Sequence, residues 1–271
     1  MLTTEQRNPK TTNLDKMSSL EIITAMNQEN AYSVACVEKV LPQIARAVDA
    51  IAKAFSEGGR LFYVGAGTSG RLAVADAAEC PPTFGVPHGQ VIAICAGGIN
   101  TLIHASEDIE DNPDEGIEEL KKHNLSSRDV VVGISASGGA AYVCNALDYA
   151  RGLGCTTAGI SSNKGNWIDK VSDISITPET GPEVLTGSTR LKAGNAQKMI
   201  LNMLSTAAMV RSGYVYENLM INLKPSNIKL RGRVIRIVSQ ITQLDEPAST
   251  EILEKGNWVI KDALRIWKEE Y

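Results

Sequence analysis

Five short runs rich in valine and isoleucine alternate with helix-forming segments between residues 61 and 176. We predict strands for these runs, which are Leu61–Val64, Gln90–Cys95, Asp129–Ile134, Thr156–Ile160 and Asp173–Ile176. We predict helices between them over Leu72–Cys80, Asn100–Ser106, Glu115–His123 and Ala141–Leu153. Because this alternation favours parallel pairing with helices on both faces, we expect an α/β fold with a doubly wound, mostly parallel five-stranded sheet.

Helical segments flank this alternation on both sides. Residues 1–18 are polar and irregular and indicate an arm, which is followed by a short helix over Ser19–Asn27 and an amphipathic helix over Ser33–Phe55, bent at Pro42. Beyond the sheet we predict a loop over Gly181–Lys192, a helix over Ala193–Val210, and two or three further helices with a break at Asp245-Glu246-Pro247. We therefore expect three parts: an N-terminal region over 1–55, the sheet domain over 56–212 and a C-terminal helical region over 213–271.

The composition is typical of a soluble globular protein, with 43% hydrophobic and 21% charged residues among 271 and a net charge of −4. No basic run interleaved with aromatic residues occurs, so we expect no nucleic-acid partner. No apolar run of 18 residues and no N-terminal leader pattern occur, so we expect a cytoplasmic protein with no membrane partner. The cysteines lack the spacing of metal ligands and are expected to be buried thiols.

The first predicted strand runs directly into a glycine-rich turn that opens a helix, Gly65-Ala66-Gly67-Thr68-Ser69-Gly70. Glycines let the backbone approach a ligand closely, and the amides and dipole of a helix N-terminus favour an anion. The hydroxyls of Thr68 and Ser69 make a phosphate the expected anion.

Two alternatives for this glycine-rich turn stay open. The turn could be purely structural, or it could be a GxGxxG dinucleotide site, although the second strand ends in Cys95-Ala96-Gly97-Gly98 without the acidic residue that such a site needs.

A second loop of small and hydroxyl-bearing residues, Ser135-Ala136-Ser137-Gly138-Gly139, follows the third predicted strand. Since parallel strands end at the same edge of a sheet, the two loops should meet there. A serine after a strand could instead be a hydrolase nucleophile. The G-x-S-x-G pattern is not matched, however, and His88 and His104 precede these serines, while His123 lies just before the third strand. We therefore do not expect acyl transfer.

Several motifs carry a family resemblance. GAGTSGR, SASG and GSTRLKAGNAQK resemble the flavodoxin-like sugar isomerase (SIS) domain, which binds phosphosugars. AECPPTFG, EDIEDNPDEG and the N-terminal TEQRNP more narrowly resemble the N-acetylmuramic acid 6-phosphate etherases, over nearly the whole chain to about residue 235. The resemblance implies cleavage of the lactyl ether of that sugar phosphate with water, giving N-acetylglucosamine 6-phosphate and D-lactate in cell-wall amino sugar recycling. It implies no metal and no cofactor.

The resemblance also implies roles for individual residues. Removal of the C2 proton, loss of lactate from C3 and addition of water need two proton carriers near pH 7, which two partly desolvated carboxylates can supply. Glu110 matches the base at C2, and Glu79 matches the acid that protonates lactate. On the residues alone, Glu79 could be a surface carboxylate, and Glu110 could belong to a solvated acidic cluster over 107–115. We expect phosphate and sugar contacts from Gly67, Thr68, Ser69, Ser135, Ser137, Ser188, Thr189 and Lys192, although Lys192 could also simply be solvated.

A single subunit poses a problem of reach. If Ser69 caps a continuous helix, Glu79 lies about 15 Å further along it, too far to act on a sugar whose phosphate is bound at Ser69. We therefore expect a homodimer in which Glu79 enters the partner's site.

One departure from the family concerns the residues after Ser137-Gly138, where Gly139-Ala140-Ala141 replace the usual Arg-Thr-Pro. The missing guanidinium could weaken a substrate contact.

Two other functions fit the same motifs. A regulator resembling glucokinase regulatory protein would keep the phosphosugar pocket without turnover. An aldose–ketose isomerase would also begin by removing the C2 proton, but it would give a ketose and no lactate. The presence of both Glu79 and Glu110 favours the etherase.

Overall fold

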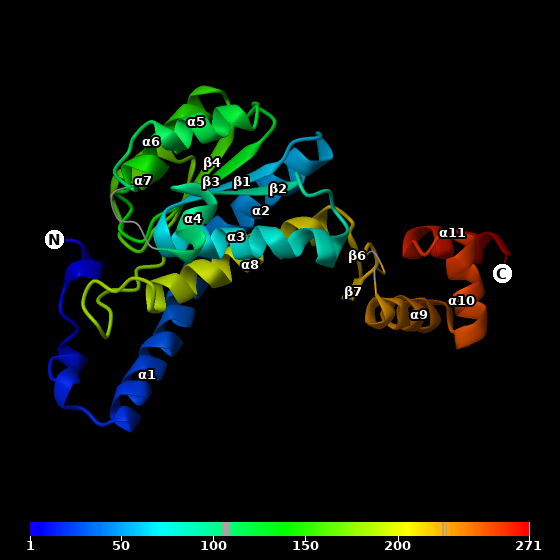
Figure 1. The fold of residues 1–271 in the computed structure, drawn as a ribbon, viewed down its shortest axis with the longest axis horizontal. Helices are drawn as coiled ribbons and strands as arrows, with labels where there is room; N and C mark the ends of the chain where they lie inside the picture. The colour runs from blue at the N-terminus through cyan, green and yellow to red at the C-terminus, as the bar shows by residue number, and fades with distance from the viewer. Residues whose placement is uncertain (105–108, 224, 226, 271) are drawn as a thin grey trace. The chain divides into compact units, whose positions relative to one another are not determined.

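The computed structural model describes residues 1–104, 109–223, 225 and 227–270. The chain divides into two compact units (Figure 1). The first unit comprises Met1–Ala77 and Gly89–Ala208, and the second comprises Ala78–His88 and Met209–Tyr271. Helices α3 and α8 each run from the first unit into the second.

The first unit is built on a five-stranded sheet in which every pairing is parallel. The strands are β1 (Leu61–Gly65), β2 (Val91–Cys95), β3 (Val130–Ile134), β4 (Thr156–Ile160) and β5 (Ile174–Ile176). Their spatial order is β2-β1-β3-β4-β5, the order of flavodoxin-like doubly wound sheets. The predicted fold class is confirmed, and each predicted strand is present to within one or two residues.

Helices cover both faces of this sheet (Figure 1). They are α2 (Leu41–Ser56), α3 (Gly67–Phe84), α4 (Gly98–Ile103), α5 (Glu115–Lys122), α6 (Ala141–Gly152), α7 (Trp167–Val171) and α8 (Lys192–Arg211). Phe62 and Val64 of β1 pack in one core cluster with α6. Because side chains alternate along a strand, Leu61 and Tyr63 point to the face opposite Phe62 and Val64. Helix α2 also contacts β1. Burial of β1 on both faces accounts for its unbroken apolar sequence.

Strand register brings the ends of β1, β2 and β3 together. Gly65, the last residue of β1, pairs with Cys95 on one side and with Ile134 on the other. The glycine-rich turn after β1 and the serine-rich loop after β3 therefore leave the sheet from adjacent strands. As predicted, both loops lie at the carboxyl edge of the sheet.

The helices differ from the predicted ones at two places, both of which contain proline. The predicted short helix over Ser19–Asn27 and the single helix predicted over Ser33–Phe55 are both wrong in their bounds: α1 (Ser19–Glu38) continues past Asn27 and ends before Lys39, and α2 begins at Leu41. Pro42 lies in the first turn of α2, where its missing N–H costs no hydrogen bond. The predicted stop before Pro81-Pro82 is also wrong, because α3 continues through both prolines to Phe84.

The second unit contains a short hairpin and a helical cluster. The hairpin pairs β6 (Val215–Tyr216) with β7 (Leu219–Met220), which the sequence did not predict. The helices are α9 (Ile228–Thr242), α10 (Glu246–Lys255) and α11 (Ile260–Glu270). The predicted break is confirmed: Asp245 caps α10 by accepting from the amide of Ala248. Val234, Val238 and Leu253 lie in the shared core of these helices.

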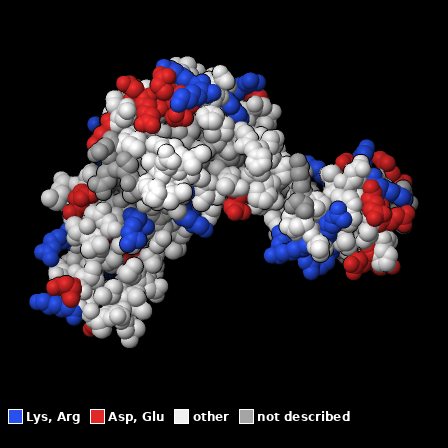
Figure 2. Space-filling view, in the orientation of Figure 1, with Lys and Arg blue, Asp and Glu red and all other residues white. Residues whose placement is uncertain are grey.

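Charged side chains are distributed differently over the two units (Figure 2). Acidic and basic residues lie side by side over α5, where Lys121 pairs with Glu118 and Lys122 with Glu119. Basic side chains gather over α9, whose sequence holds Lys229, Arg231, Arg233 and Arg236. Among the residues described, no helix is long and apolar enough to span a membrane.

Candidate active site

The glycine-rich turn after β1 is held close to the sheet. A Cβ added to Gly65 would lie 2.8 Å from the amide nitrogen of Gly70, and one added to Gly70 would lie 2.5 Å from the Cys95 sulfur. Both glycines are therefore required for backbone packing. This packing lets α3 begin directly over the end of β1, and it places Thr68 and Ser69 in the first turn of the helix.

Ser69 is buried and bonded to a side chain far away in the sequence. Its Oγ donates to Oε1 of Gln197 on α8 at 3.0 Å. Gln197 is only 2% exposed, and within the described part of the chain its Nε2 has no hydrogen-bond partner. A buried amide donor without a partner costs free energy, so this pair can bind a ligand oxygen favourably.

The loop after β3 brings its two serines together. Ser135 Oγ and Ser137 Oγ lie 3.3 Å apart. The amide of Gly138 donates to Ser135 Oγ at 3.1 Å, and the amide of Gly139 donates to Ser137 Oγ at 3.2 Å. These amides hold the hydroxyl oxygens in place. One serine hydroxyl donates to the other, so the second hydroxyl of the pair can offer its proton to an anion.

The loop over residues 181–191 approaches the start of α3. A Cβ added to Gly194 would lie 3.4 Å from the backbone oxygen of Thr189 and 3.7 Å from Cγ2 of Thr68. Thr68 and Thr189 therefore border the same turn of α8. The structure thus places the turn with Thr68 and Ser69 next to the loop with Ser188 and Thr189, and the loop with Ser135 and Ser137 leaves the strand adjacent to β1.

Lys192 forms a buried ion pair with Glu29 of α1. Its Nζ also lies 5.5 Å from the centre of the Tyr32 ring. Burial works to raise the pKa of Glu29, but hydrogen bonds from Lys192 and Lys10 outweigh burial and hold that pKa below its usual value. The predicted contact between Lys192 and substrate stays a prediction, because the ammonium group of Lys192 is paired with the carboxylate of Glu29.

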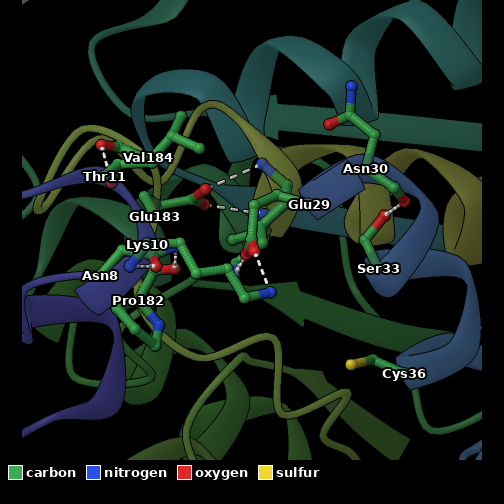
Figure 3. A network of polar contacts seen from close by, with 12 residues as sticks. Asn8, Lys10, Thr11, Glu29, Asn30, Ser33, Cys36, Pro182, Glu183 and Val184 are labelled. Carbon is green, nitrogen blue, oxygen red and sulfur yellow. Dashed lines mark hydrogen bonds and ion pairs between the residues drawn. The ribbon is translucent and has the colours of Figure 1, made fainter. Parts of the chain in front are cut away.

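Glu183 occupies the N-terminus of α8. Its carboxylate accepts from the amides of Lys192 and Ala193 at 3.1 and 2.9 Å (Figure 3). A carboxylate is favoured at this end of a helix, although complete burial raises the pKa of Glu183. The backbone amides of Ser188 and Thr189 donate to the backbone oxygens of Leu185 and Gly187, so these two residues would bind a ligand through their side chains.

Glu110 is tied to the serine-rich loop through its backbone. Its carbonyl oxygen accepts from the amide of Tyr142 at 3.0 Å, in the first turn of α6, which follows Ser135–Gly139. The Glu110 side chain is exposed. Two members of the predicted acidic cluster, Glu107 and Asp108, lie outside the described residues.

Glu79 is also exposed and lies on α3, ten residues beyond Ser69. It belongs to the segment Ala78–His88 of the second unit, whereas Glu110 belongs to the first. A joint action of Glu79 and Glu110 stays a prediction. Among the residues described, no group of three or more histidines, cysteines or carboxylates could hold a metal ion.

Gln197 did not stand out in the sequence analysis. It lies within GSTRLKAGNAQK, but it reads as one polar residue in a helix. The available signal was its position: Gln197 shares a helical face with Ile200, Leu201 and Leu204, all of which are buried. A polar residue at a core-facing position needs a partner, and this need marks it as a residue to examine.

Comparisons with known proteins bear on this site. A family model described as the glucokinase regulatory protein N-terminal SIS domain matches residues 43–151, and an SIS domain model matches residues 107–207. The chain is 52% identical over 261 residues to the N-acetylmuramic acid 6-phosphate etherase of Edwardsiella ictaluri, covering 96% of this chain and 87% of that relative. The corresponding etherase of Cronobacter sakazakii is 49% identical over 263 residues, covering 97% and 89%.

The chain belongs to the N-acetylmuramic acid 6-phosphate etherase family. The resemblance found in the sequence motifs is thus confirmed. The fold of this etherase family member is similar to that of a phosphoheptose isomerase from Francisella tularensis, with a TM-score of 0.54 and 18% identity. That match covers 71% of this chain and 98% of the isomerase, and it concerns the fold alone.

Proposed function

We propose that this protein cleaves the D-lactyl ether of N-acetylmuramic acid 6-phosphate with water, giving N-acetylglucosamine 6-phosphate and D-lactate in cell-wall amino sugar recycling. The observation that carries this proposal is the 52% identity over 96% of the chain to a relative of that name. The three hydroxyl-bearing segments support a phosphosugar substrate, because hydroxyl and amide donors at strand ends and helix starts suit an anion.

The chemistry begins with the open-chain sugar, whose C1 aldehyde makes the C2 proton acidic. We assign Glu110 as the base that removes this proton. The electron pair left at C2 then expels lactate from C3, and Glu79 protonates the ether oxygen as the C3–O bond breaks. Glu79, now ionised, takes a proton from the water that adds at C3 of the unsaturated aldehyde. Glu110, after its proton has exchanged with solvent, protonates C2 to give the product. Both carboxylates thus return to their starting states.

We assign the phosphate and hydroxyl groups of the sugar to the three segments. Ser69 and Thr68 lie where the dipole of α3 favours negative charge. Ser135 and Ser137 leave the adjacent strand end, and their oxygens are already fixed by backbone amides. A site of this kind orients the sugar so that its C2 and C3 atoms meet the carboxylates.

We further propose a homodimer with shared active sites. In the single chain Glu79 and Glu110 are both exposed, whereas proton transfer near pH 7 favours partly desolvated carboxylates. Helix α1 presents Leu20, Ile23 and Val34, which are 71%, 59% and 56% exposed. Apolar side chains exposed on one helix suit a second copy of the chain. A partner subunit that covers this surface and inserts its Glu79 into the site would bury the carboxylates in part. It would also remove the problem of the distance between Ser69 and Glu79 within one chain.

A regulator that binds a phosphosugar without turnover is the second candidate, and the match to the glucokinase regulatory protein model favours it. Incubation of the purified protein with N-acetylmuramic acid 6-phosphate separates the candidates. The etherase releases one D-lactate per sugar, an isomerase gives a ketose without lactate, and a regulator leaves the substrate unchanged. We expect D-lactate.

We place the reaction in the cytoplasm, since a charged sugar phosphate does not cross a bilayer unaided and must share a compartment with its enzyme.

A further inference from the structure

Within the N-terminal arm (residues 1–18), the segment over residues 3–16 buries polar side chains. It consists of three short 3₁₀ turns, Thr3–Glu5, Pro9–Thr11 and Leu14–Lys16. Thr4, Asn8 and Thr11 are all buried, although the arm is short and polar. Buried polar groups need partners, and the partners of these residues lie in two distant loops.

One amide joins the arm to the serine-rich loop. Asn163 lies after β4, and its Oδ1 accepts from the backbone amide and the hydroxyl of Thr3, both at 2.8 Å. Its Nδ2 donates to Thr4 Oγ1 and to the backbone oxygen of Ala136, both at 3.1 Å. Because Ala136 lies between Ser135 and Ser137, Asn163 links the start of the arm to the loop that carries these serines.

The second half of the arm holds the loop that carries Ser188 and Thr189 (Figure 3). Thr11 Oγ1 donates to the backbone oxygen of Val184 at 2.8 Å, and Asn8 Nδ2 donates to the backbone oxygen of Pro182 at 3.3 Å. Between these two acceptors, Glu183 caps α8. The arm therefore fixes the start of the loop over residues 181–191.

Ion pairs connect the arm to α1 and to the start of α8. Lys10 of the arm pairs with Glu29 Oε1 at 3.0 Å, and Glu29 pairs in turn with the buried Lys192 at the start of α8. The Lys10 side chain is 68% exposed, so this outer pair contributes little by itself. The inner pair is buried on both sides, and loss of either partner would leave an uncompensated charge.

We infer that the N-terminal arm is a positioning element of the active site, which sets the distance between the Ser135–Ser137 loop and the Ser188–Thr189 loop. The inference rests on the proposed function, in which both loops bind one sugar phosphate. Loop 181–191 contains Gly181 and Gly187, both with positive φ, and glycine loses more conformational freedom on folding than any other residue, so contacts from the arm help to hold the loop. Thr4 and Thr11 act through the loops and touch no reacting atom.

The test removes the hydroxyls of Thr4 and Thr11 in the full chain with the double variant Thr4→Val/Thr11→Val. KM and kcat come from D-lactate release, affinity for N-acetylglucosamine 6-phosphate comes from calorimetry, and stability comes from urea unfolding. We expect KM and the product Kd to rise about tenfold, the effect of two lost hydrogen bonds, with kcat within about twofold of the wild-type value. Thr11→Ser, which keeps the hydroxyl, should restore most of the affinity lost in Thr11→Val.

Two matched controls isolate positioning from stability. Thr12→Val changes the exposed neighbour of Thr11 and should alter nothing. Thr157→Val removes a buried hydroxyl that bonds Asp173 Oδ2 at 2.9 Å near the amino end of β4. It should lower the urea midpoint and leave KM unchanged. If the double variant does not fold, Thr11→Val alone is measured in the same way.

The inference is overturned if the arm variants lower the urea midpoint as Thr157→Val does while KM and the product Kd keep their wild-type values. It is also overturned if the arm variants match Thr12→Val in every measurement. Failure of the proposed function gives a different result, because the wild-type protein would then release no lactate. The product Kd would still report on the arm.

Discussion

The backbone carbonyl of Glu110 accepts a hydrogen bond from the backbone amide of Tyr142 at 3.0 Å. This bond fixes the main chain at Glu110 to the start of α6, directly after the loop with Ser135 and Ser137. Since the bond involves no side chain, a substitution at position 110 leaves it in place.

Glu110→Gln should abolish base catalysis and preserve the fold. Loss of a positioned general base lowers rates by about 10²- to 10⁴-fold, so we expect kcat for D-lactate release to fall within this range. The urea midpoint should stay at the wild-type value because the residue is exposed. Asp111→Asn, a change of the neighbouring carboxylate, is the control and should keep kcat within about threefold. Equal losses in both variants would contradict the assignment of Glu110.

Glu79→Gln and Ser69→Ala should each be inactive alone and active in mixture. If each site combines Ser69 of one subunit with Glu79 of the other, half of the randomly mixed dimers hold one intact site. About a quarter of the wild-type activity should then return after co-refolding. Mixing the two variants without subunit exchange is the control. Activity no higher than that of the separate variants after exchange would indicate that Glu79 acts in its own subunit.

Gln197→Met should weaken substrate binding by removing the partner of Ser69. The methionine side chain has a similar length but no amide, so the Ser69 hydroxyl loses its 3.0 Å acceptor and the site loses a buried donor. We expect KM to rise about five- to tenfold, with a smaller effect on kcat. Asn195→Ala, at an exposed position of the same helix, serves as the control. An unchanged KM in Gln197→Met would remove Gln197 from the site.

Asp129→Ala should lower the free energy of unfolding, measured with urea near pH 7, by about 3 kcal/mol, which is the cost of removing one partner of a buried ion pair. Asp129 accepts from Arg60 Nη2 at 2.9 Å and from the amides of Arg60 and Ser126 at 2.8 Å each. Burial alone would raise the pKa of Asp129, but these bonds outweigh burial and hold that pKa below its ordinary value of 3.8.

The pH dependence of this effect follows from the direction of the shift. A carboxyl whose pKa is lower in the folded state stabilises the protein above its ordinary pKa and loses this effect as pH falls through the folded pKa. The gap in unfolding free energy between the wild-type protein and Asp129→Ala should therefore narrow below about pH 4. A gap that widens on acidification would contradict the ion pair.

The sequence was sufficient for the architecture because its signals are local. Short runs such as Leu61–Val64 are buried on both faces, and the glycine turn after them admits only a tight strand-to-helix connection. The break at Lys39–Val40 was missed because apolar spacing continues across it, and only the fixed φ of Pro42 marks a helix start rather than a bend.

The candidate site was only partly predictable. Hydroxyl-bearing loops at strand ends could be identified from order along the chain, since parallel strands share one carboxyl edge. The bonds between Ser69 and Gln197 and between Thr3 and Asn163 join residues more than a hundred positions apart. No local pattern encodes such pairs. The roles of Glu79 and Glu110 stay predictions that rest on the family resemblance and on the experiments above.

The most direct measurement of the central claim is the reaction of the purified wild-type protein with N-acetylmuramic acid 6-phosphate in D₂O. Removal of the C2 proton and later reprotonation by solvent predict one D-lactate per sugar and deuterium at C2 of the N-acetylglucosamine 6-phosphate formed. Release of lactate with hydrogen retained at C2 would contradict the account, in which the proton taken up by Glu110 exchanges with D₂O before C2 is reprotonated.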